Sequence, residues 1–204
     1  YTTLFRSLGV YCRQSLAKYL DADFVFEQTI AGFRFYESRF ARPYPFSKYD
    51  QIFVPEYNAG AMENAGCITF RDEYIFRTKP SGAQLDQLTN TILHELAHMW
   101  FGDLVTMKWW DDLWLNESFA EFMSYWCMAE GTRFSDAWTG FTMRKVWGVN
   151  CDQLPTTHPI VAPITDLADV EVNFDGITYS KGACVLRQLV AYVGEQNFLV
   201  ALHN

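Results

Sequence analysis

The sequence has 204 residues, of which 50% are hydrophobic and 17% aromatic, so it is long and apolar enough to bury a core. Its formal net charge is −8 and no run of lysines and arginines occurs, which argues against nucleic acid as a partner and against a polybasic membrane anchor. No apolar run reaches the length that spans a bilayer, so we expect no membrane insertion within this segment.

The five cysteines are odd in number and widely scattered, and no two of them form a CxxC pair. A disulfide framework would require paired cysteines, so this pattern is typical of reduced thiols. We therefore expect a cytoplasmic setting for this protein.

The first predicted element is a helix over residues 22–40. Apolar residues recur there at roughly helical spacing, and Asp23 stands near the start as a candidate cap. The following segment RPYPFSKYD contains two prolines, which forbid regular helix. We expect this segment to turn and to lead into the next element.

Two strands are predicted on either side of the loop NAGAMENAG. The segments QIFVPEY (51–57) and CITFRDEYIF (67–76) are rich in aromatic and β-branched residues, which favour strands. Pro55 has no amide hydrogen to donate, so it either places the first strand at the edge of a sheet or ends it there. An edge strand beside an open cleft could accept an extended peptide as a further strand.

Long helices follow the strands. Apolar residues keep helical spacing from about 84 to 101, where Gly102 is a candidate end, and a second helix is predicted from about 113 to 130. Prolines mark an irregular connection near 155–163, and a third helix runs from about 180 through the apolar run CVLRQLVAYV. The sequence thus predicts an α+β chain, mainly helical, with a small sheet preceding the long helices.

The first long helix contains the pentapeptide HELAH at 94–98. Residues four apart on a helix differ by about 40° around the axis and about 6 Å along it, so the imidazoles of His94 and His98 can meet at one point. Two neutral imidazoles at this spacing suit Zn²⁺. Glu95 lies about 60° from His98 around the axis, too far to share the metal but near enough to hold a water beside it.

A catalytic zinc ion with four ligands takes three from the protein and leaves the fourth position for water. Glu117 is the candidate third ligand, because it follows His98 after eighteen intervening residues and lies on the next helix. A lone HExxH motif often arises by chance, whereas this motif on a helix with a correctly placed glutamate is specific. His94, His98 and Glu117, with Glu95 as general base, form the arrangement of zinc peptidases.

Three motifs in order resemble the M1 family of zinc aminopeptidases, which are gluzincins of the aminopeptidase N type. They are GAMEN at 60–64, HELAH with the later WLNESFAE, and ITYSKGA at 177–183, and the resemblance runs through nearly all of the chain. It implies a thermolysin-like catalytic domain with one Zn²⁺ per chain. Residues 1–204 would be part of that domain, since the family's N-terminal β domain and C-terminal helical domain are not among them.

The resemblance also implies a substrate site. Its residues would be those of the GAMEN motif, namely Gly60, Ala61, Met62, Glu63 and Asn64. In the family the glutamate holds the free α-amino group of the peptide, and an α-amino group with a pKa of about 8 is largely protonated at neutral pH. Small residues beside it would let the substrate backbone approach. We therefore expect peptides with a free N-terminus as partners.

Tyr179 in ITYSKGA would, by the same resemblance, donate a hydrogen bond to the oxyanion of the tetrahedral intermediate. Without the family it is one of eleven tyrosines, and a place in the core or on the surface would be the default interpretation. Glu121 lies four residues after Glu117 and so on the same helical face. It could orient a zinc-bound imidazole, or it could be a solvated or salt-bridged side chain.

The expected function is zinc-dependent removal of the N-terminal residue from peptides, with water as the attacking group. Two alternatives stay open. An epoxide hydrolase of the leukotriene A4 hydrolase type shares the zinc site. Comparing the turnover of amino acid amides with the turnover of a lipid epoxide would distinguish the two functions. A non-catalytic relative would serve as a scaffold for partners. Such proteins lose metal ligands or the general base, whereas this sequence keeps His94, Glu95, His98 and Glu117.

Overall fold

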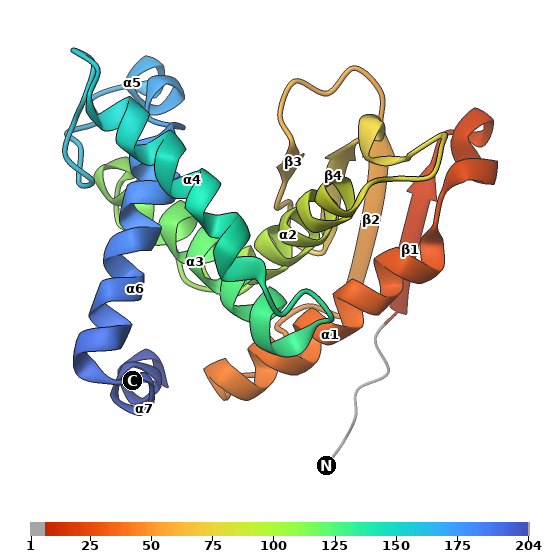
Figure 1. Cartoon of the computed structure of the whole chain (residues 1–204), viewed down its shortest axis with the longest axis horizontal. Coiled ribbons are helices and arrows are strands. Elements are labelled where there is room, and N and C mark those ends of the chain that lie inside the picture. Colours follow the sequence, from red (N-terminus) through yellow and green to blue (C-terminus); the bar gives the residue numbers. More distant parts are fainter. Residues whose placement is uncertain (1–6, 204) are drawn as a thin grey trace.

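Residues 7–203 are described in the computed structural model of the chain. The elements in chain order are β1 (Ser7–Cys12), η1 (Gln14–Tyr19), α1 (Ala22–Phe40), β2 (Lys48–Val54), β3 (Ala61–Met62), β4 (Cys67–Arg71), η2 (Asp72–Tyr74), α2 (Gly82–His98), η3 (Trp110–Asp112), α3 (Leu113–Gly131), α4 (Ala137–Asp152), α5 (Leu167–Val172), η4 (Ile177–Lys181), α6 (Gly182–Val193) and α7 (Glu195–His203). The sheet lies at one side of the molecule, α4 to α7 lie at the other, and α2 and α3 lie between them (Figure 1). The predicted class, a mainly helical α+β chain with a sheet before the long helices, is confirmed.

The sheet has four strands in the order β1-β2-β4-β3. β2 runs parallel to both of its neighbours, whereas β3 runs antiparallel to β4. Buried side chains of the two inner strands, including Phe53 and Phe70, face the helical part of the core and stack at 5.2 Å between ring centroids. The short β3 is therefore the edge of the sheet that faces the helices.

The predicted strand over residues 51–57 is β2, which ends at Val54, directly before Pro55. Because β2 lies between β1 and β4, an edge position for this strand is wrong, and the alternative that the proline ends it is confirmed. The edge strand that contacts α2 is β3 instead (Figure 1). The second predicted strand, 67–76, stops at Arg71, where η2 begins.

The predicted helices are present with small shifts at their ends. α1 spans the predicted residues, but its cap is Asp21 rather than Asp23, since Asp21 Oδ1 accepts a hydrogen bond of 3.0 Å from Phe24 N. α2 begins with a capping box at Ser81 and ends at His98, shortly before Gly102 with a φ of 140°. α3 matches its prediction to within one residue.

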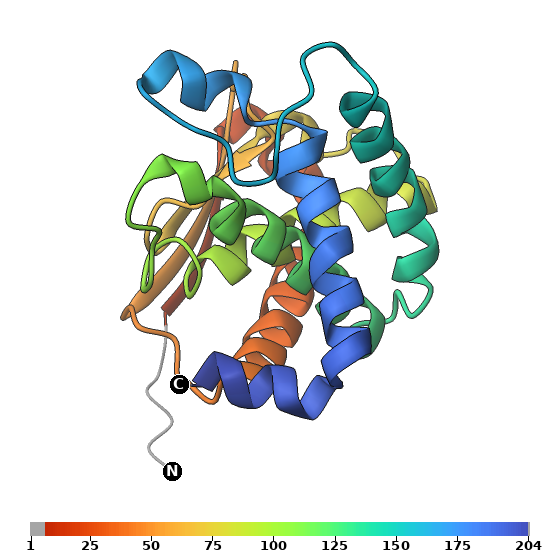
Figure 2. The same ribbon diagram turned by 90° about the vertical axis from the view of Figure 1, so that its left-hand side faces the viewer.

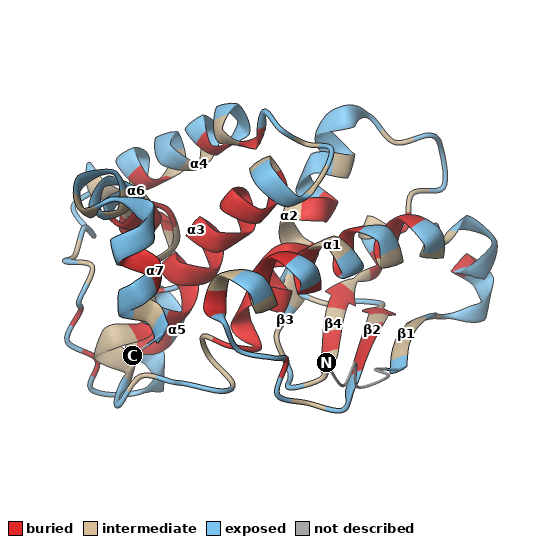
Figure 3. Cartoon of the chain, turned by 90° about the horizontal axis from the view of Figure 1, so that it is seen from below, coloured by how far each residue is buried: buried red, intermediate tan, exposed pale blue. Residues whose placement is uncertain are grey.

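The core forms where α2 packs between α1 and α3. Tyr36 of α1 donates a hydrogen bond of 2.8 Å to the carbonyl of Leu93 in α2. Gly32 permits this close approach, because a Cβ there would lie 2.6 Å from the side chains of Leu93 and Leu96. α3 is buried along most of its length (Figure 3). The second half of α2, which carries the HELAH motif, and the part of α3 that carries Glu117 are therefore buried in this core.

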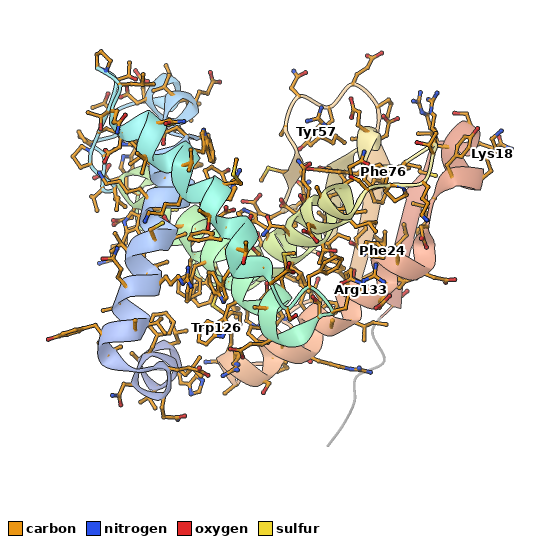
Figure 4. The ribbon with its side chains drawn as sticks, in the orientation of Figure 1. Lys18, Phe24, Tyr57, Phe76, Trp126 and Arg133 are labelled. Atoms are coloured by element: carbon orange, nitrogen blue, oxygen red, sulfur yellow. The ribbon has the colours of Figure 1, made fainter. Side chains whose placement is uncertain are left out.

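Outer elements complete the helical part. α6 crosses α3 on one side (Figure 2), and α4 packs against both α3 and η4. The guanidinium carbon of Arg133, which follows α3, lies 5.4 Å from the ring centroid of Phe24 at the start of α1 (Figure 4). The third predicted helix starts at Gly182 because residues 177–181 form the π-helical turn η4. In the described part of the chain, no helix is both long and apolar enough to cross a bilayer.

Candidate metal centre

The predicted metal ligands lie on the two central helices, α2 and α3. His94 and His98 stand one turn apart at the end of α2, and Glu117 follows the first turn of α3. Nε2 of His94 lies 3.0 Å from Nε2 of His98, and Oε2 of Glu117 lies 3.2 Å and 3.3 Å from these two nitrogens. The three buried side chains therefore converge on one point, as their spacing predicts.

These three donor atoms fit one zinc-sized cation. Ligand atoms that are about 2.0–2.2 Å from a tetrahedral ion lie about 3.3–3.6 Å from one another. The observed separations of 3.0 to 3.3 Å are close to that spacing. Two imidazole nitrogens and one carboxylate oxygen also form a donor set that Zn²⁺ accepts. Among residues 7–203, no second group of three His, Cys, Asp or Glu side chains is arranged to hold an ion.

Each imidazole has a separate partner at its other nitrogen. Nδ1 of His98 lies 3.0 Å from the carbonyl oxygen of Phe101. Because a carbonyl only accepts, this contact places the proton on Nδ1 and leaves the lone pair of Nε2 for a metal. Nδ1 of His94 lies 3.5 Å from Oε2 of Glu121, which is itself buried. Both histidines are thus turned with Nε2 toward the common point.

The electrostatics of this centre favour a cation. Burial lowers the pKa of His94, but its contacts with Glu117 and Glu121 outweigh burial and raise that pKa to about 10. Burial likewise lowers the pKa of His98, while Glu63 and Glu117 raise it to about 9. Burial raises the pKa of Glu117, and the two imidazoles more than reverse this. The acidic groups therefore attract positive charge, which a proton or a metal ion can supply.

Glu95 is 5% exposed and lies on the wall of a cavity beside His94. Its Oε2 atom has no hydrogen-bond partner among the described residues. Burial raises the pKa of Glu95 to about 8, opposed by the neighbouring imidazoles. A buried carboxylate oxygen that lacks a partner is costly to keep unless a water or a ligand satisfies it. Glu95 therefore presents an unpartnered carboxylate oxygen beside the metal centre.

Tyr179 comes from the π-helical turn η4 and lies against His94, with ring centroids 5.8 Å apart and planes inclined by 17°. Burial, together with the charges of Glu117 and Glu95, raises the pKa of Tyr179 well above its ordinary value. The phenol therefore stays protonated at neutral pH and remains a hydrogen-bond donor. The structure brings this residue to the metal centre, 62 positions after Glu117 in the sequence.

The GAMEN segment forms the edge strand beside the centre. Ala61 and Met62 make up β3, and the carbonyl of Gly60 accepts a hydrogen bond of 3.1 Å from the amide of Arg71. Glu63 follows β3, with its Oε1 atom 3.9 Å from Nδ1 of His98. Asn64 differs from the rest of the motif, because its amide donates a hydrogen bond of 3.3 Å to Thr69 Oγ1 rather than lining a cavity.

Two open cavities meet at the metal centre. One of about 620 Å³ is bordered by His94, Glu95 and Arg144, and the other of about 1000 Å³ by Glu63 and Glu117. The residues that line both are Ala59, Ala61, Phe174 and Tyr179. A ligand bound across this boundary would therefore place one part on the Glu63 side and the other on the Glu95 side.

Sequence patterns do not reveal every residue at this centre. Arg144 lies in α4, a helix that we did not predict, and contacts Glu121 from 23 positions away. Ser118 donates a hydrogen bond of 2.5 Å to the carbonyl of Thr178, which precedes Tyr179. Neither contact follows from a spacing rule, because each depends on how separate helices pack. The sequence did indicate that Glu121 lies on the same helical face as Glu117, but it did not indicate the partners of Glu121.

A helix that carries HExxH, and a glutamate that joins it from the next helix, define the class of mononuclear metal centres found in gluzincin-type peptidases. The chain belongs to peptidase family M1, because the sequence profile of the peptidase family M1 domain matches residues 24–204. The resemblance inferred from the three sequence motifs is thereby confirmed.

Curated relatives agree with this assignment. The chain is 61% identical over 194 residues to aminopeptidase N of Streptomyces lividans, an alignment that covers 94% of this chain and 23% of that protein. It is 48% identical over 166 residues to the tricorn protease-interacting factor F2 of Thermoplasma volcanium, and this alignment covers 80% of this chain and 21% of that protein. It is 38% identical over 181 residues to aminopeptidase M1-B of Oryza sativa subsp. japonica, covering 88% and 21%. The chain thus spans about a fifth of the length of these relatives.

Proposed function

We propose that the protein is a zinc-dependent aminopeptidase and that this chain supplies part of its catalytic domain. The observation that carries the proposal is the convergence of His94, His98 and Glu117, with Glu95 beside them. Membership of family M1 and the similarity to a protein named aminopeptidase N support it. Zinc is the proposed metal because two imidazoles and one carboxylate, with a fourth position open, suit its catalytic sites.

A zinc ion in this site would polarise the carbonyl of the scissile peptide bond and lower the pKa of the attacking water. Glu95 takes the proton of that water on its carboxylate and then returns it to the nitrogen of the leaving amine. Its place on the cavity wall beside His94, with one carboxylate oxygen that has no partner among the described residues, suits both directions of this transfer. Tyr179 Oη donates a hydrogen bond to the oxygen that becomes negative in the tetrahedral intermediate.

Glu63 binds the α-ammonium group of the substrate and so selects the first peptide bond. Its carboxylate borders the cavity of about 1000 Å³, whereas Glu95 borders the cavity of about 620 Å³. The first residue of the peptide therefore lies on the Glu63 side, and the residues after the scissile bond lie on the other side. Ala61 borders both cavities, and its small side chain leaves room there for a peptide backbone.

The test is hydrolysis of aminoacyl amides by the full-length protein. We expect activity that a chelator removes and zinc restores. Glu95→Gln should lower kcat by about 10²- to 10⁴-fold with zinc still bound, because it removes the proton acceptor. Glu63→Ala should lower kcat/KM by about 10- to 100-fold, the loss expected for a charged hydrogen bond.

Blocked substrates provide the control for the role of Glu63. N-acetylated amides lack the ammonium group, so wild type should cut them poorly. The Glu63→Ala variant should discriminate much less between free and acetylated forms. Equal rates on both forms by wild type would contradict this role, and turnover of a lipid epoxide without amide hydrolysis would contradict the aminopeptidase function itself.

A further inference from the structure

Glu121 is a buried acid that the proposed chemistry does not use. It lies one turn after Glu117 on α3 and is 1% exposed. A carboxylate in such a place is strongly destabilising unless it is paired and hydrogen-bonded. Its two oxygens have different partners, since Oε1 accepts a hydrogen bond of 2.5 Å from Nε of Arg144 and Oε2 lies 3.5 Å from Nδ1 of His94.

The contact with His94 determines how that imidazole is turned. An anionic oxygen at Nδ1 favours the tautomer with its proton on Nδ1 and with the lone pair on Nε2, which faces His98 and Glu117. The carbonyl of Phe101 has the corresponding position at His98. The two histidine ligands thus differ, because one is oriented by a neutral backbone group and the other by a charged side chain.

Arg144 connects this acid to another part of the molecule. It comes from α4, and its guanidinium lies 4.4 Å from the ring of Trp147, one turn further along the same helix. Arg144 and Trp147 line the cavity that also contains His94 and Glu95. A series of contacts from Arg144 through Glu121 to His94 therefore joins the cavity wall on α4 to a metal ligand on α2, by way of α3.

We propose that Glu121 and Arg144 act as a positioning pair for the metal centre. Arg144 holds one oxygen of Glu121, and the other oxygen holds the His94 ring in the orientation that presents Nε2 to the ion. Neither residue touches the ion or the substrate's reacting atoms. The proposal rests on the metal site of the proposed function but not on peptide hydrolysis, because its consequence is tighter retention of the ion.

The experiment measures how fast the zinc-loaded full-length protein releases its ion to an excess of a chromogenic chelator. Glu121→Gln should release zinc about 10- to 100-fold faster, the usual effect of removing a group that orients a ligand. An amide offers one acceptor oxygen and cannot serve Arg144 and His94 together. Arg144→Met should also accelerate release, and Arg144→Lys should restore part of the retention because it keeps the charge.

Ser124→Ala is the matched control. Ser124 is buried on α3, where its hydroxyl donates a hydrogen bond of 2.9 Å to the main-chain carbonyl of Glu121 and accepts one of 2.8 Å from Asn90 on α2. It thus joins the same two helices through groups that are neither the Glu121 carboxylate nor a metal ligand. Its loss should lower the melting temperature but leave zinc release at the wild-type rate. If Ser124→Ala released zinc as fast as Glu121→Gln does, the faster release would reflect a general loosening of the contact between α2 and α3. That result would overturn the proposal.

Zinc release at the wild-type rate by both Glu121→Gln and Arg144→Met would also overturn the positioning role, while the metal site itself would stand. Failure of the wild-type protein to bind zinc would instead refute the metal centre and the proposed function with it. If Glu121→Gln does not fold, the comparison of Arg144→Met with Ser124→Ala decides. A ¹⁵N measurement of the His94 ring should show a proton on Nδ1 in wild type and a shifted signal in Arg144→Met.

Discussion

Tyr179 illustrates how single residues of this centre depend on their surroundings. Its ring lies nearly parallel to that of His94, and burial with the nearby charges of Glu117 and Glu95 keeps the pKa of its phenol well above the ordinary value. The same negative charges that make the phenol hard to ionise also make it a reliable donor. The oxyanion role proposed for Tyr179 is therefore compatible with its packing against His94.

Replacement of this phenol gives a prediction at the residue scale. Tyr179→Phe keeps the ring against His94 but removes the donor, so kcat should fall by about 10²- to 10³-fold with little change in KM or zinc content. Steady-state kinetics on an aminoacyl amide measures this. Tyr192→Phe is the control, because Tyr192 is 90% exposed and lines neither of the two cavities. Full activity of Tyr179→Phe would exclude the phenol from the chemistry.

At the scale of elements, the junction of α3 with η4 and α6 positions the tyrosine relative to the metal ligands. Ser118, next to Glu117, donates its hydroxyl hydrogen to the carbonyl of Thr178, next to Tyr179. Gly182 makes room for this contact, since a Cβ there would lie 1.9 Å from Ser118 Oγ. This contact between their neighbours thus fixes the position of Tyr179, the proposed oxyanion donor, relative to Glu117.

The close approach at this junction predicts a pair of compensating substitutions. Gly182→Ala should lower the free energy of unfolding by about 1–3 kcal/mol, because an added methyl group must displace a packed side chain. Ser118→Gly in the same chain removes the obstructing atoms and should recover much of that loss. Urea denaturation of the two single variants and the double variant measures both effects.

Gly140→Ala is the control for this pair. No atom lies within 4 Å of a Cβ placed at Gly140 in α4, so alanine there should leave stability unchanged or raise it through its better helix propensity. If Gly182→Ala were as stable as wild type, or if Ser118→Gly failed to relieve it, the junction would not be packed as described.

At the scale of the whole molecule, the metal centre lies where the sheet side and the helical side join. Two imidazoles and the carboxylates of Glu95, Glu117 and Glu121 are buried there between α2, α3 and η4. Such a group of polar side chains costs free energy unless a cation or well-placed hydrogen bonds satisfy it. An ion that binds only the folded state therefore stabilises the entire domain.

Metal removal should accordingly lower the stability of the whole fold. An ion present at about 100 times its dissociation constant adds about 2.7 kcal/mol to the free energy of unfolding. Calorimetry should therefore show a lower melting temperature in the presence of a chelator, and recovery when excess zinc is added. The Glu117→Ala variant should show little response to either. Identical melting curves for wild type with and without chelator would contradict a structural contribution of the metal.

Much of this centre could be read from the sequence because the relevant geometry is local. The positions of His94, Glu95 and His98 follow from the pitch of one helix, and α2 and α3 themselves follow from the period of their apolar residues. The place of Glu117 needed only that the helix after the connection of residues 99–112 return to the first one. The roles of Glu63 and Tyr179 came from family resemblance and stay predictions, although both side chains lie at the cavities beside the metal site.

The rest was decided by the tertiary structure. β1 and α4 were not predicted, and without β1 the interior position of β2 could not be known, since strand order depends on pairing between distant segments. The contacts of Arg144 with Glu121 and of Ser118 with Thr178 likewise join residues that only helix packing brings together. The sequence by itself therefore determined which side chains could bind a metal, because that depends on spacing within single helices. The fold decided which other side chains orient them, because that depends on how the helices meet.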